Sequence, residues 1–525
     1  MKNTMIRGSV LAMLCLCAKF IAITHPATAQ PFTTVINVPP DPDPAFIGSD
    51  TQLNLFAGGV LPDGFTLAGT LFGPNTNIET NINGGTAGNS LTLGVPEGFG
   101  TNSDITLNIN SGTVGRGLTV NDGGTVNING GAIGDFLEVV SGGTVNLNEG
   151  GVLGDRVTPF NGSTFNINGG TIGEFFEPRN NTTVNIRGGT IGDDFSLGFD
   201  TRVSISGGIV PEIRYVGSGG TLDLSGGNID QFFSQATDTT ITGSEFMLDG
   251  VPIPGLETPG NSVTIPTNSG FLTTTFADGA VFASSPRALG DTLTLIAIDA
   301  PVKAAVINSP SEPEPLGLRL GQTLNLSLGA DLVDYFTAVD SILNIDGGSI
   351  GKGLKTYGTL VDITDGAVGE YFSARAGSTI HISGGQVAHG MILVESSARI
   401  TGGDIAGLDV VSNSIADIFG GSIEEIDARS DSIVNLTGQS FILDGVDITP
   451  SLTPGSRLTI TDRDVILEGL LADGSPFSFN LETTNPALSN NFAATATLTV
   501  TLVPEPGTVA ILGVGGLAIL RRRRV

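Results

Sequence analysis

The chain has 525 residues, of which 76 are glycine, four are tyrosine and none is tryptophan, and its formal net charge is −29. This composition is typical of a repetitive β architecture and disfavours a compact enzyme, whose pockets draw on tryptophan, tyrosine and histidine. Both cysteines, Cys15 and Cys17, lie in the N-terminal apolar stretch, which excludes disulfides and thiol chemistry in the rest of the chain.

The first 29 residues are typical of a secretory signal peptide. Lys2 and Arg7 precede an apolar run from Val10 to Ile23, and the small residues that follow predict cleavage between Ala29 and Gln30. A retained membrane anchor is the alternative. A lipoprotein is disfavoured, because leucine rather than a small residue precedes each cysteine. We therefore expect export through the general secretion machinery.

A repeat of about 19 residues then dominates the sequence. Phrases such as TVNINGG recur, and the second glycine of each pair falls at Gly112, Gly131, Gly151, Gly170, Gly189, Gly208 and Gly227. The alternation of apolar and polar residues in TVNI, residues 125–128, predicts a strand, and the Gly-Gly pair predicts a turn. Short strands joined by tight corners within 19 residues are typical of one coil of a parallel β-helix.

The chain is also an internal duplication. The phrase VIN at residues 35–37 returns at 306–308 with an offset of 271, and FMLDGV at 246–251 returns as FILDGV at 441–446 with an offset of 195. Each copy ends with an Asp-Gly pair between alternating flanks, at Asp278-Gly279 and at Asp473-Gly474, which predicts a β-hairpin. Such modules would cover the open end of a coil array.

These patterns predict an all-β fold class, with two tandem parallel β-helix arrays of about 19-residue coils, each followed by a small β-hairpin-rich capping module. The expected order is a signal peptide at 1–29, a Pro-rich lead at 30–48, a first array at 49–243, a capping module at 244–305, a Pro-rich linker at 306–320, a second array at 321–438, a second capping module at 439–503 and a C-terminal tail at 504–525.

One corner of the first array carries an acidic residue on successive coils. Four places after the second glycine stand Asp135, Asp155, Glu174, Asp193 and Glu212. Stacked carboxylates repel unless water or a cation separates them, and clustered carboxylate oxygens suit Ca²⁺. The sequence therefore leaves open a Ca²⁺ strip or, as the favoured interpretation, a solvated corner that keeps the rod soluble. The second copy breaks the pattern, with Lys352 and His389 at the matching places.

Two further rows recur along the coils. Aromatic residues predict an internal stack, with a sugar-stacking platform as the alternative, and they are Phe136, Phe175, Phe176, Phe195, Phe232, Phe233, Tyr371 and Phe372. Asparagines predict a hydrogen-bonded ladder, with contact to sugar hydroxyls as the alternative, and they are Asn81, Asn108, Asn127, Asn166, Asn185 and Asn344.

Catalytic motifs are missing from the sequence. After the signal peptide the chain has only His381 and His389, which are too few for a histidine-rich metal site or a Ser-His-Asp triad. It has no nucleophile elbow, zinc-protease, phosphate-loop or dinucleotide fingerprint. The sequence thus predicts no catalytic residues, no enzyme activity and no cofactor other than the Ca²⁺ left open above.

The C-terminal tail has three consecutive features. It begins with Pro504, Glu505 and Pro506, continues with an apolar run at 508–520 and ends with a basic block, Arg521, Arg522, Arg523 and Arg524. The 13-residue run would be a short transmembrane helix, below the roughly 20 residues that span a bilayer without strain. The arginines would be held on the cytoplasmic side of the membrane.

This order of elements resembles the PEP-CTERM sorting signal of exosortase substrates, over the last 22 or so residues. The resemblance implies a Gram-negative bacterium, retention in the inner membrane during transit and removal of the tail by an exosortase. It also implies delivery to the outer surface or the extracellular polysaccharide. An ordinary short C-terminal anchor is the alternative.

Removing both ends takes away seven of the 23 basic residues and one of the 52 acidic residues, which leaves a net charge of −35. Such a charge disfavours nucleic acid and anionic membranes as partners. We expect an exported, non-catalytic structural or adhesive protein of the cell surface or extracellular matrix, with exopolysaccharide as a candidate partner. A β-helix carbohydrate-active enzyme or polysaccharide-binding protein is the alternative.

Overall fold

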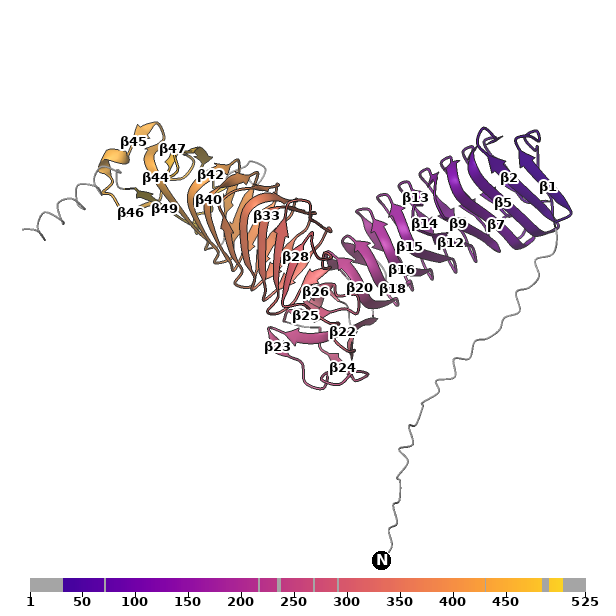
Figure 1. Ribbon diagram of the computed structural model, residues 1–525, viewed down its shortest axis with the longest axis horizontal. Coiled ribbons are helices and arrows are strands. Elements are labelled where there is room, and N and C mark those ends of the chain that lie inside the picture. Colours follow the sequence, from indigo (N-terminus) through magenta and orange to yellow (C-terminus); the bar gives the residue numbers. More distant parts are fainter. Residues whose placement is uncertain are drawn as a thin grey trace, which may run out of the picture.

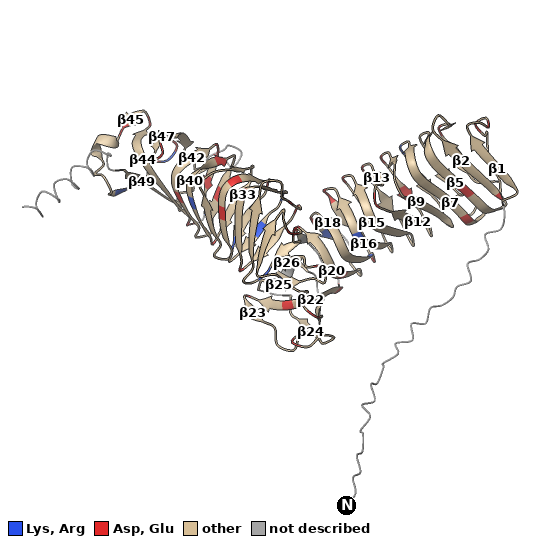
Figure 2. Cartoon of the chain, viewed as in Figure 1, with Lys and Arg blue, Asp and Glu red and all other residues tan. Residues whose placement is uncertain are grey.

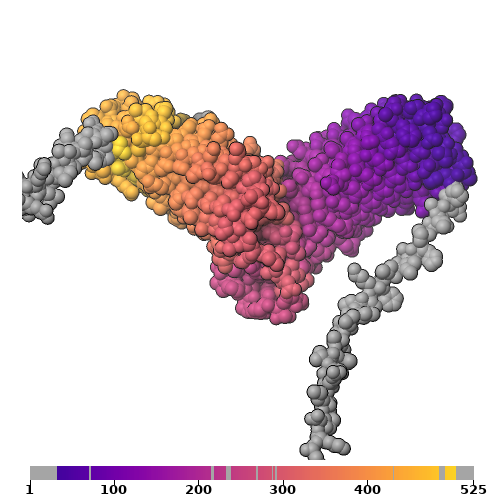
Figure 3. All heavy atoms as spheres, viewed as in Figure 1, coloured from indigo at the N-terminus to yellow at the C-terminus, as the bar shows by residue number. Residues whose placement is uncertain are grey.

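The protein is an all-β molecule whose stacked coils form two arms that meet at an elbow. Figure 1 shows the arms as a wide V with a hairpin module at the vertex, and the space-filling view shows this module bulging from the elbow (Figure 3). The computed structural model describes residues 32–69, 72–215, 218–233, 238–267, 270–289, 292–429, 431–483 and 491–503. The expected fold class, a parallel β-solenoid of about 19-residue coils, is confirmed.

The first arm is organised around one long parallel sheet, to which each coil adds a strand. In order along the arm its strands are β1 (Thr34–Val38), β2 (Thr51–Phe56), β5 (Pro74–Ala87), β7 (Thr101–Val114), β9 (Gly124–Ile128), β12 (Thr144–Leu147), β15 (Thr164–Ile172), β16 (Thr183–Ile191), β18 (Arg202–Val210), β20 (Thr221–Ile229) and β22 (Asp238–Leu248).

Short strands complete the coils of this arm. Some follow the glycine corner within the long sheet, namely β3 (Val60–Leu61), β10 (Ala132–Ile133) and β13 (Val152–Leu153). Others form two further parallel sheets, namely β4 (Thr66–Leu67), β6 (Thr92–Leu93), β8 (Thr119–Val120), β11 (Glu138–Val139) and β14 (Thr158–Pro159), then β17 (Phe195–Leu197), β19 (Ile213–Tyr215) and β21 (Phe232–Phe233).

The second arm repeats this plan. Its long sheet contains β28 (Val306–Ser309), β30 (Thr323–Ser327), β33 (Ile342–Ile350), β35 (Leu360–Val368), β37 (Thr379–Ile382), β40 (Ser397–Ile405), β42 (Ile415–Ile423) and β44 (Ile433–Leu443). The short β31 (Asp331–Leu332) pairs with β33, and the short β38 (Gln386–Val387) pairs with β35 and β40. Its second sheet contains β29 (Gly317–Leu318), β32 (Thr337–Val339), β34 (Lys355–Tyr357), β36 (Ser373–Arg375), β39 (Met391–Val394), β41 (Leu408–Val411) and β43 (Ile426–Ala428).

Strict register explains why the alternating sequence forms a core. In the pairing of β9 with β12, Val126 lies beside Val145 and Ile128 beside Leu147, and all four side chains are buried. Successive side chains of a strand point to opposite faces, so the polar residues between them lie outside. Each arm has its own continuous hydrophobic core, from Val38 to Leu295 and from Ile307 to Val500. Figure 2 shows that most of the ribbon is tan and that the charged residues, more of them acidic than basic, are scattered along both arms.

The glycine pair places a bulge in several of the long strands. Between β15 and β16 the register shifts on both sides of Asn168. Gly170 has a φ of 73° there, and a Cβ on it would lie 2.4 Å from the carbonyl oxygen of Gly151 in the preceding coil. Only a residue without a side chain fits such a corner, because both the left-handed backbone and the close approach exclude a Cβ.

A hairpin module follows the coils of each arm. The first contains β23 (Val251–Pro252), β24 (Ser262–Ile265), β25 (Leu272–Thr275), β26 (Val281–Ser284), the 3₁₀ turn η1 (Pro286–Ala288) and β27 (Thr292–Ala297). The second contains β45 (Val446–Asp447), η2 (Thr449–Ser451), β46 (Arg457–Ile460), β47 (Ile466–Leu471), β48 (Pro476–Asn480) and β49 (Thr497–Leu502).

The two hairpin modules are built alike. Strands β25 and β26, like β47 and β48, form antiparallel hairpins at the two Asp-Gly pairs. The aspartate of each hairpin reaches the glycine corner of the arm, where Asp278 Oδ2 accepts the N–H of Gly227 at 2.7 Å and Asp473 Oδ2 accepts the N–H of Gly421 at 2.9 Å. The last strands, β27 and β49, pair in parallel with β22 and β44. The internal duplication therefore extends to the contacts of the modules.

The expected boundaries do not coincide with breaks in the structure. Strands β22 and β44 run through the expected ends of the arrays at 243 and 438. The Pro-rich segments are parts of the solenoid, since β1 pairs with β2 and β28 pairs with β30 in parallel. The reason is that proline at a corner leaves the neighbouring strand residues free to join the sheet.

None of the helical segments in the described part of the chain is long and apolar enough to cross a membrane. The expected signal peptide at 1–29, with its cleavage point at Ala29 and Gln30, lies outside the described residues. So does the tail from Pro504, including the expected transmembrane helix at 508–520.

Candidate functional site

The acidic strip lies along one corner of the first arm, where its side chains join neighbouring coils. Asp135 Oδ1 accepts the N–H of Asp155 at 3.1 Å, and Asp155 Oδ1 accepts the N–H of Glu174 at 2.9 Å. A carboxylate that accepts a backbone N–H of the next coil holds the stack together. Within the described residues, no three or more His, Cys, Asp and Glu side chains gather as they would around a metal ion. Calcium binding to the strip stays a prediction.

The strip ends in ion pairs rather than in a row of free carboxylates. Asp193 Oδ1 lies 3.0 Å from Lys352 Nζ in the second arm, although 159 residues separate them in sequence. Glu212 Oε1 lies 2.6 Å from Nε of Arg214, and Asp194 Oδ1 lies 3.4 Å from Nη1 of the same arginine. The lysine that breaks the acidic pattern in the second copy is thus the partner of the first copy's strip.

A polar cavity of about 180 Å³ lies between the two arms at these ion pairs. Its walls include Asp193, Asp194, Glu212, Arg214, Asp230, Tyr335, Lys352 and Tyr371. The hydroxyl of Tyr335 lies 3.4 Å from Asp193 Oδ1, and burial raises the pKa of Tyr335 to about 12. Burial alone would lower the pKa of Lys352, but hydrogen bonds to Asp193 and Tyr335 outweigh it and raise that pKa. The cavity therefore presents cationic and anionic groups beside two phenol hydroxyls, a set that can hydrogen-bond a polyhydroxylated ligand.

Sequence reasoning missed this elbow cavity. Its residues come from separate repeats, and no local motif relates them. Two signals were available: the lysine at position 352 of an otherwise acidic corner, and the crowding of three of the four tyrosines at 335, 357 and 371.

A second ion pair holds the elbow from inside. Lys355 Nζ lies 2.8 Å from Asp230 Oδ1, and the lysine side chain is only 9% exposed. The same ammonium group donates to the main-chain carbonyl of Asp230. Burial lowers the pKa of Lys355, and the attraction of Asp230 opposes that shift. A buried pair of this kind fixes the position of one arm against the other, because separating it leaves an unpaired charge.

The aromatic residues divide into two groups, so the prediction of a single internal stack is partly wrong. Phe176, Phe195 and Phe372 are buried, and the rings of Phe176 and Phe195 stack at 5.1 Å. Phe136 and Phe175 instead lie half-buried on the outer corner. There the guanidinium carbon of Arg156 lies 5.2 Å and 5.7 Å from the two ring centroids.

The difference between these groups is conformational. Phe136, Phe175 and Tyr371 have positive φ at the bend of the corner, and this turns their side chains away from the core. Tyr371 is 62% exposed. The side chains of Phe232 and Phe233 lie outside the described ones.

The asparagine ladder is confirmed. Asn127 Nδ2 donates to Asn108 Oδ1 at 2.8 Å and accepts from Asn146 at the same distance. The bonds of this row link Asn37, Asn54, Asn81, Asn108, Asn127, Asn146, Asn166 and Asn185, and in the second arm Asn308, Asn325 and Asn344. A second, more exposed ladder runs two residues further on through Asn83, Asn110, Asn129, Asn148 and Asn168.

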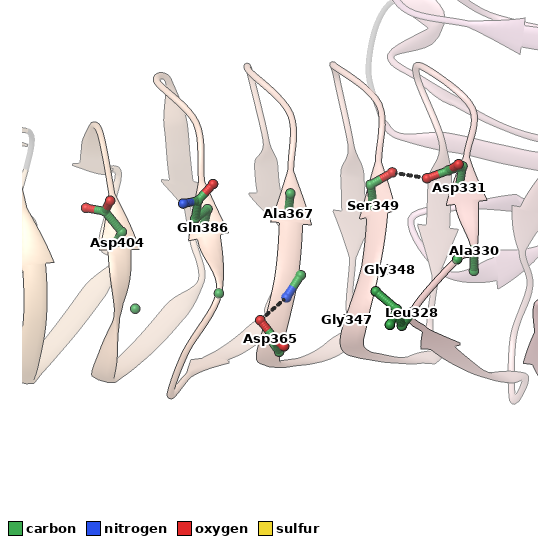
Figure 4. Close-up of a pocket in the computed structure, with 14 residues that line it drawn as sticks. Leu328, Ala330, Asp331, Gly347, Gly348, Ser349, Asp365, Ala367, Gln386 and Asp404 are labelled. Carbon is green, nitrogen blue, oxygen red and sulfur yellow. Dashed lines mark hydrogen bonds between the residues drawn. The ribbon is translucent and has the colours of Figure 1, made fainter.

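The second arm has an open groove of about 700 Å³ along its glycine corner (Figure 4). Its lining includes Gly348, Gly366, Gly385 and Gly403 from successive coils, together with Asp331, Asp365, Gln386 and Asp404. The carboxylate of Asp365 accepts the N–H of Gly366 at 2.8 Å, and Asp331 accepts the hydroxyl of Ser349. The groove is thus a shallow channel of glycine and other small residues with a few polar side chains and no aromatic ring in its lining.

The two histidines do not meet. His381 Nδ1 lies 2.8 Å from Asp362 Oδ1 of the preceding coil, and the pair is exposed on the outer face of the long sheet. This pair takes the place of two asparagines in the ladder row. His389 lies in the corner between β38 and β39, beside Gly407 of the next coil.

Comparison with known proteins identifies the C-terminal tail. Residues 502–524 match the PEP-CTERM protein-sorting motif, in agreement with the resemblance seen in Pro504, Glu505, Pro506 and the arginine block. No curated protein matches the chain. A PEP-CTERM motif directs export, holds the protein in the membrane by its C-terminal signal and makes it a substrate of an exosortase. The chain is therefore an exported β-solenoid protein that carries a PEP-CTERM motif and is sorted by an exosortase.

Proposed function

We propose that this protein is a non-catalytic structural or adhesive rod of the outer surface or extracellular matrix. The observation that carries the proposal is a two-armed solenoid held together along its length. Asparagine hydrogen bonds link successive coils, and the Lys355–Asp230 and Lys352–Asp193 ion pairs link the two arms. Such a scaffold stays rigid over its whole length, which suits a load-bearing or spacing role.

The chemistry of the outer surface supports the same proposal. The chain without its two ends has a net charge of −35, which keeps single rods soluble in a hydrated matrix. Most strip and ladder side chains are engaged with their neighbours in the next coil, as the bonds of Asp135, Asp155 and Asn127 illustrate. These groups stabilise the stack and are poorly placed for acid–base chemistry.

The test is a deletion strain complemented with the wild-type gene or with a gene whose arginines at 521–524 are replaced. The wild type should restore cohesion of the extracellular matrix, and mass spectrometry should find a C-terminus near Pro504 on the exported protein. The arginine variant should be mislocalised and should not restore cohesion. A deletion strain with unchanged matrix and surface adhesion would contradict the structural role.

The second candidate is binding of a polysaccharide at the elbow. The mixed charges and the two tyrosines of the elbow cavity favour it, since sugar hydroxyls need both donors and acceptors and stack on aromatic rings. Oligosaccharides from the native matrix should then bind the protein, and Tyr371→Ala should weaken binding. Arg179→Gln, which removes an exposed ion pair elsewhere on the first arm, is the matched control. New reducing ends after incubation would overturn the non-catalytic assignment.

A further inference from the structure

The hairpin β25–β26 of the first module has one face that the second arm covers. This face consists of Phe271, Thr273, Thr275, Val281 and Ala283, all buried or half-buried. Val281 and Ala283 pack with Val339 and Tyr357 of the second arm.

Two further contacts seal this face. The rings of Phe271 and Tyr357 lie 4.4 Å apart, and a Cβ on Gly317 would lie 2.7 Å from the backbone nitrogen of Val281. The first coils of the second arm therefore pack against this face of the β25–β26 hairpin.

The second module presents the same face uncovered. The offset of 195 that relates the modules also preserves the hairpin register, since Thr273 pairs with Ala283 as Glu468 pairs with Ser478. The matching face consists of Ile466, Glu468, Leu470, Pro476 and Ser478, and all five are exposed. Ile466 is 46% and Leu470 39% exposed, although both are large and apolar. We call these five residues the open hairpin face.

The other end of the molecule carries exposed apolar side chains as well. Phe46, Phe72 and Phe99 in the opening coils of the first arm are 75%, 80% and 49% exposed. The rings of Phe72 and Phe99 lie 6.0 Å apart. The offset of 271 places Phe46 at the position of Gly317, which is one of the residues that meet the hairpin face at the elbow. We call these three residues the leading aromatic patch.

We infer that the open hairpin face binds the leading aromatic patch of a second copy of this chain. In the first copy of the duplication the beginning of an arm covers the hairpin face, and after the second copy no arm follows. The beginning of another molecule supplies a related surface, in which Phe46 stands at the position of Gly317 and Phe72 and Phe99 are additional exposed rings. Exposed apolar side chains at both ends gain by mutual burial. The contact is heterologous and does not close on itself, so it produces linear chains of rods.

The intermolecular contact lacks the elbow's Lys352–Asp193 and Lys355–Asp230 pairs, since the offset of 271 places Asn81 and Gly84 at the positions of the two lysines. It differs from the elbow in two further respects. Phe46 replaces Gly317, so aromatic rings rather than a close backbone approach meet the hairpin. The elbow also has an ion pair, at 3.4 Å, between Glu245 and the buried Arg319. The matching residues are Ser440 and Gly48, which cannot form it. Association between molecules is therefore more apolar than the elbow and reversible with concentration.

The test uses the processed protein purified from its producing cells, followed by sedimentation velocity and light scattering across a concentration series. The wild type should grow into linear oligomers. Leu470→Asp on the open hairpin face and Phe72→Asp on the leading aromatic patch should each weaken association about tenfold or more, because a charge replaces an apolar contact at the centre of the interface. Val446→Asp is the control, since Val446 is 64% exposed on β45 of the same module, away from this face.

A mixing experiment tests the heterologous geometry directly. Each of the two variants keeps one intact end, so a mixture of Leu470→Asp and Phe72→Asp should form 1:1 dimers that grow no further. All substituted side chains are exposed, and unchanged thermal melting will show that the variants fold. Wild-type protein that stays monomeric, or that stops at closed dimers, would overturn the inference. A monomeric protein that is retained on exopolysaccharide, and that loses this retention on Leu470→Asp, would also overturn the inference. The open hairpin face would then bind the polysaccharide and not a second copy of the chain.

This inference rests on the proposed structural role, but the two can fail separately. If the purified protein is monomeric but its gene still restores matrix cohesion, only the assembly inference is wrong. If the protein forms linear oligomers but the deletion strain has a normal matrix, only the proposed function is wrong.

Discussion

The buried pair between Lys355 and Asp230 gives the sharpest test of how the arms are joined. Asp230→Asn removes the countercharge of an ammonium group whose side chain is 9% exposed and leaves its bond to the main-chain carbonyl. Lys355→Met removes the charge and keeps an unbranched chain of similar length. The remaining carboxylate of Asp230 is 21% exposed, so water reaches it more easily than it reaches the lysine.

The two changes should differ in magnitude. Leaving a buried charge unpaired costs about 3–5 kcal/mol, and the surviving carbonyl bond places Asp230→Asn near 3 kcal/mol of docking energy between the arms. Lys355→Met should cost about 1 kcal/mol, because it leaves only a partly hydrated carboxylate. The double variant should resemble Lys355→Met, since the unpaired ammonium is gone.

The pH dependence follows from the lysine. Its pKa in the folded protein lies below the ordinary 10.5, so folding favours the neutral amine and stability is lost as pH falls below 10.5. Asp230→Asn removes the attraction that opposes this shift. The docking energy of that variant should therefore rise more steeply than that of the wild type as pH increases towards 10.

Small-angle X-ray scattering measures the distribution of distances between the arms, and thermal melting measures the stability. Asp230→Asn should broaden the distance distribution and introduce a lower transition, whereas Lys355→Met should do so weakly. Arg179→Gln breaks the exposed pair with Glu177. It should leave the distance distribution unchanged and lower the stability by less than about 1 kcal/mol. Equal effects of Asp230→Asn and Lys355→Met would refute the claim that burial of the ammonium decides the outcome.

Three further predictions concern the ladder, a glycine corner and the elbow. Asn127→Ala should lower the free energy of unfolding by about 1–2 kcal/mol, because it removes two hydrogen bonds of 2.8 Å. Asn129→Ala, in the more exposed ladder, should lower it by less. Denaturant titration measures both changes. Gly112→Ala should cost about 3 kcal/mol or more in the same assay, because the added Cβ would lie 2.3 Å from the carbonyl oxygen of Gly85 at a φ of +92°. Burial raises the pKa of Tyr357 to about 12, so the stability that this group contributes is complete below pH 10 and should fall by about 2 kcal/mol as pH rises to 12. Tyr357→Phe should lose less stability across this range in thermal melts.

Each of these predictions has a matched comparison. Gly260 has a φ of +88° with nothing within 4 Å of an added Cβ, so Gly260→Ala should cost only the backbone term of about 1–2 kcal/mol. Equal losses for Gly112→Ala and Gly260→Ala would mean that close packing of coils is unimportant. Equal losses for the two asparagines would mean that the lower exposure of the Asn127 ladder adds nothing to its strength. A pH profile shared by wild type and Tyr357→Phe would assign the alkaline loss to other groups.

The sequence alone determined the coil. The alternation in TVNI, residues 125–128, and the glycine pairs are local signals, and strict register stacks equal residues on one another, so Val126 meets Val145 and Asn127 meets Asn108. The duplication offsets likewise identified both Asp-Gly hairpins before their contacts with Gly227 and Gly421 were known. The sorting tail was recognised because its features lie next to one another in the chain.

Corner conformation was only partly accessible from sequence. Phe175 and Phe176 are neighbours with the same side chain, but a φ of +61° turns the first outward while the second is buried. Spacing along the repeat fixes which coil a residue belongs to and not which side of a bend it faces. The structure of the corner, with its backbone bond from Phe175 to Asp193, decides that.

The elbow, its cavity and the open hairpin face were decided by tertiary structure alone. Asp193 and Lys352 are 159 residues apart, and neither the coil period of about 19 residues nor the duplication offsets of 271 and 195 relate them. Periodicity encodes contacts between successive coils, because each coil repeats its neighbour. The angle between two arrays depends instead on a few unrepeated side chains, such as Lys355, Tyr357 and Phe271, whose contacts exist only once both arms have folded.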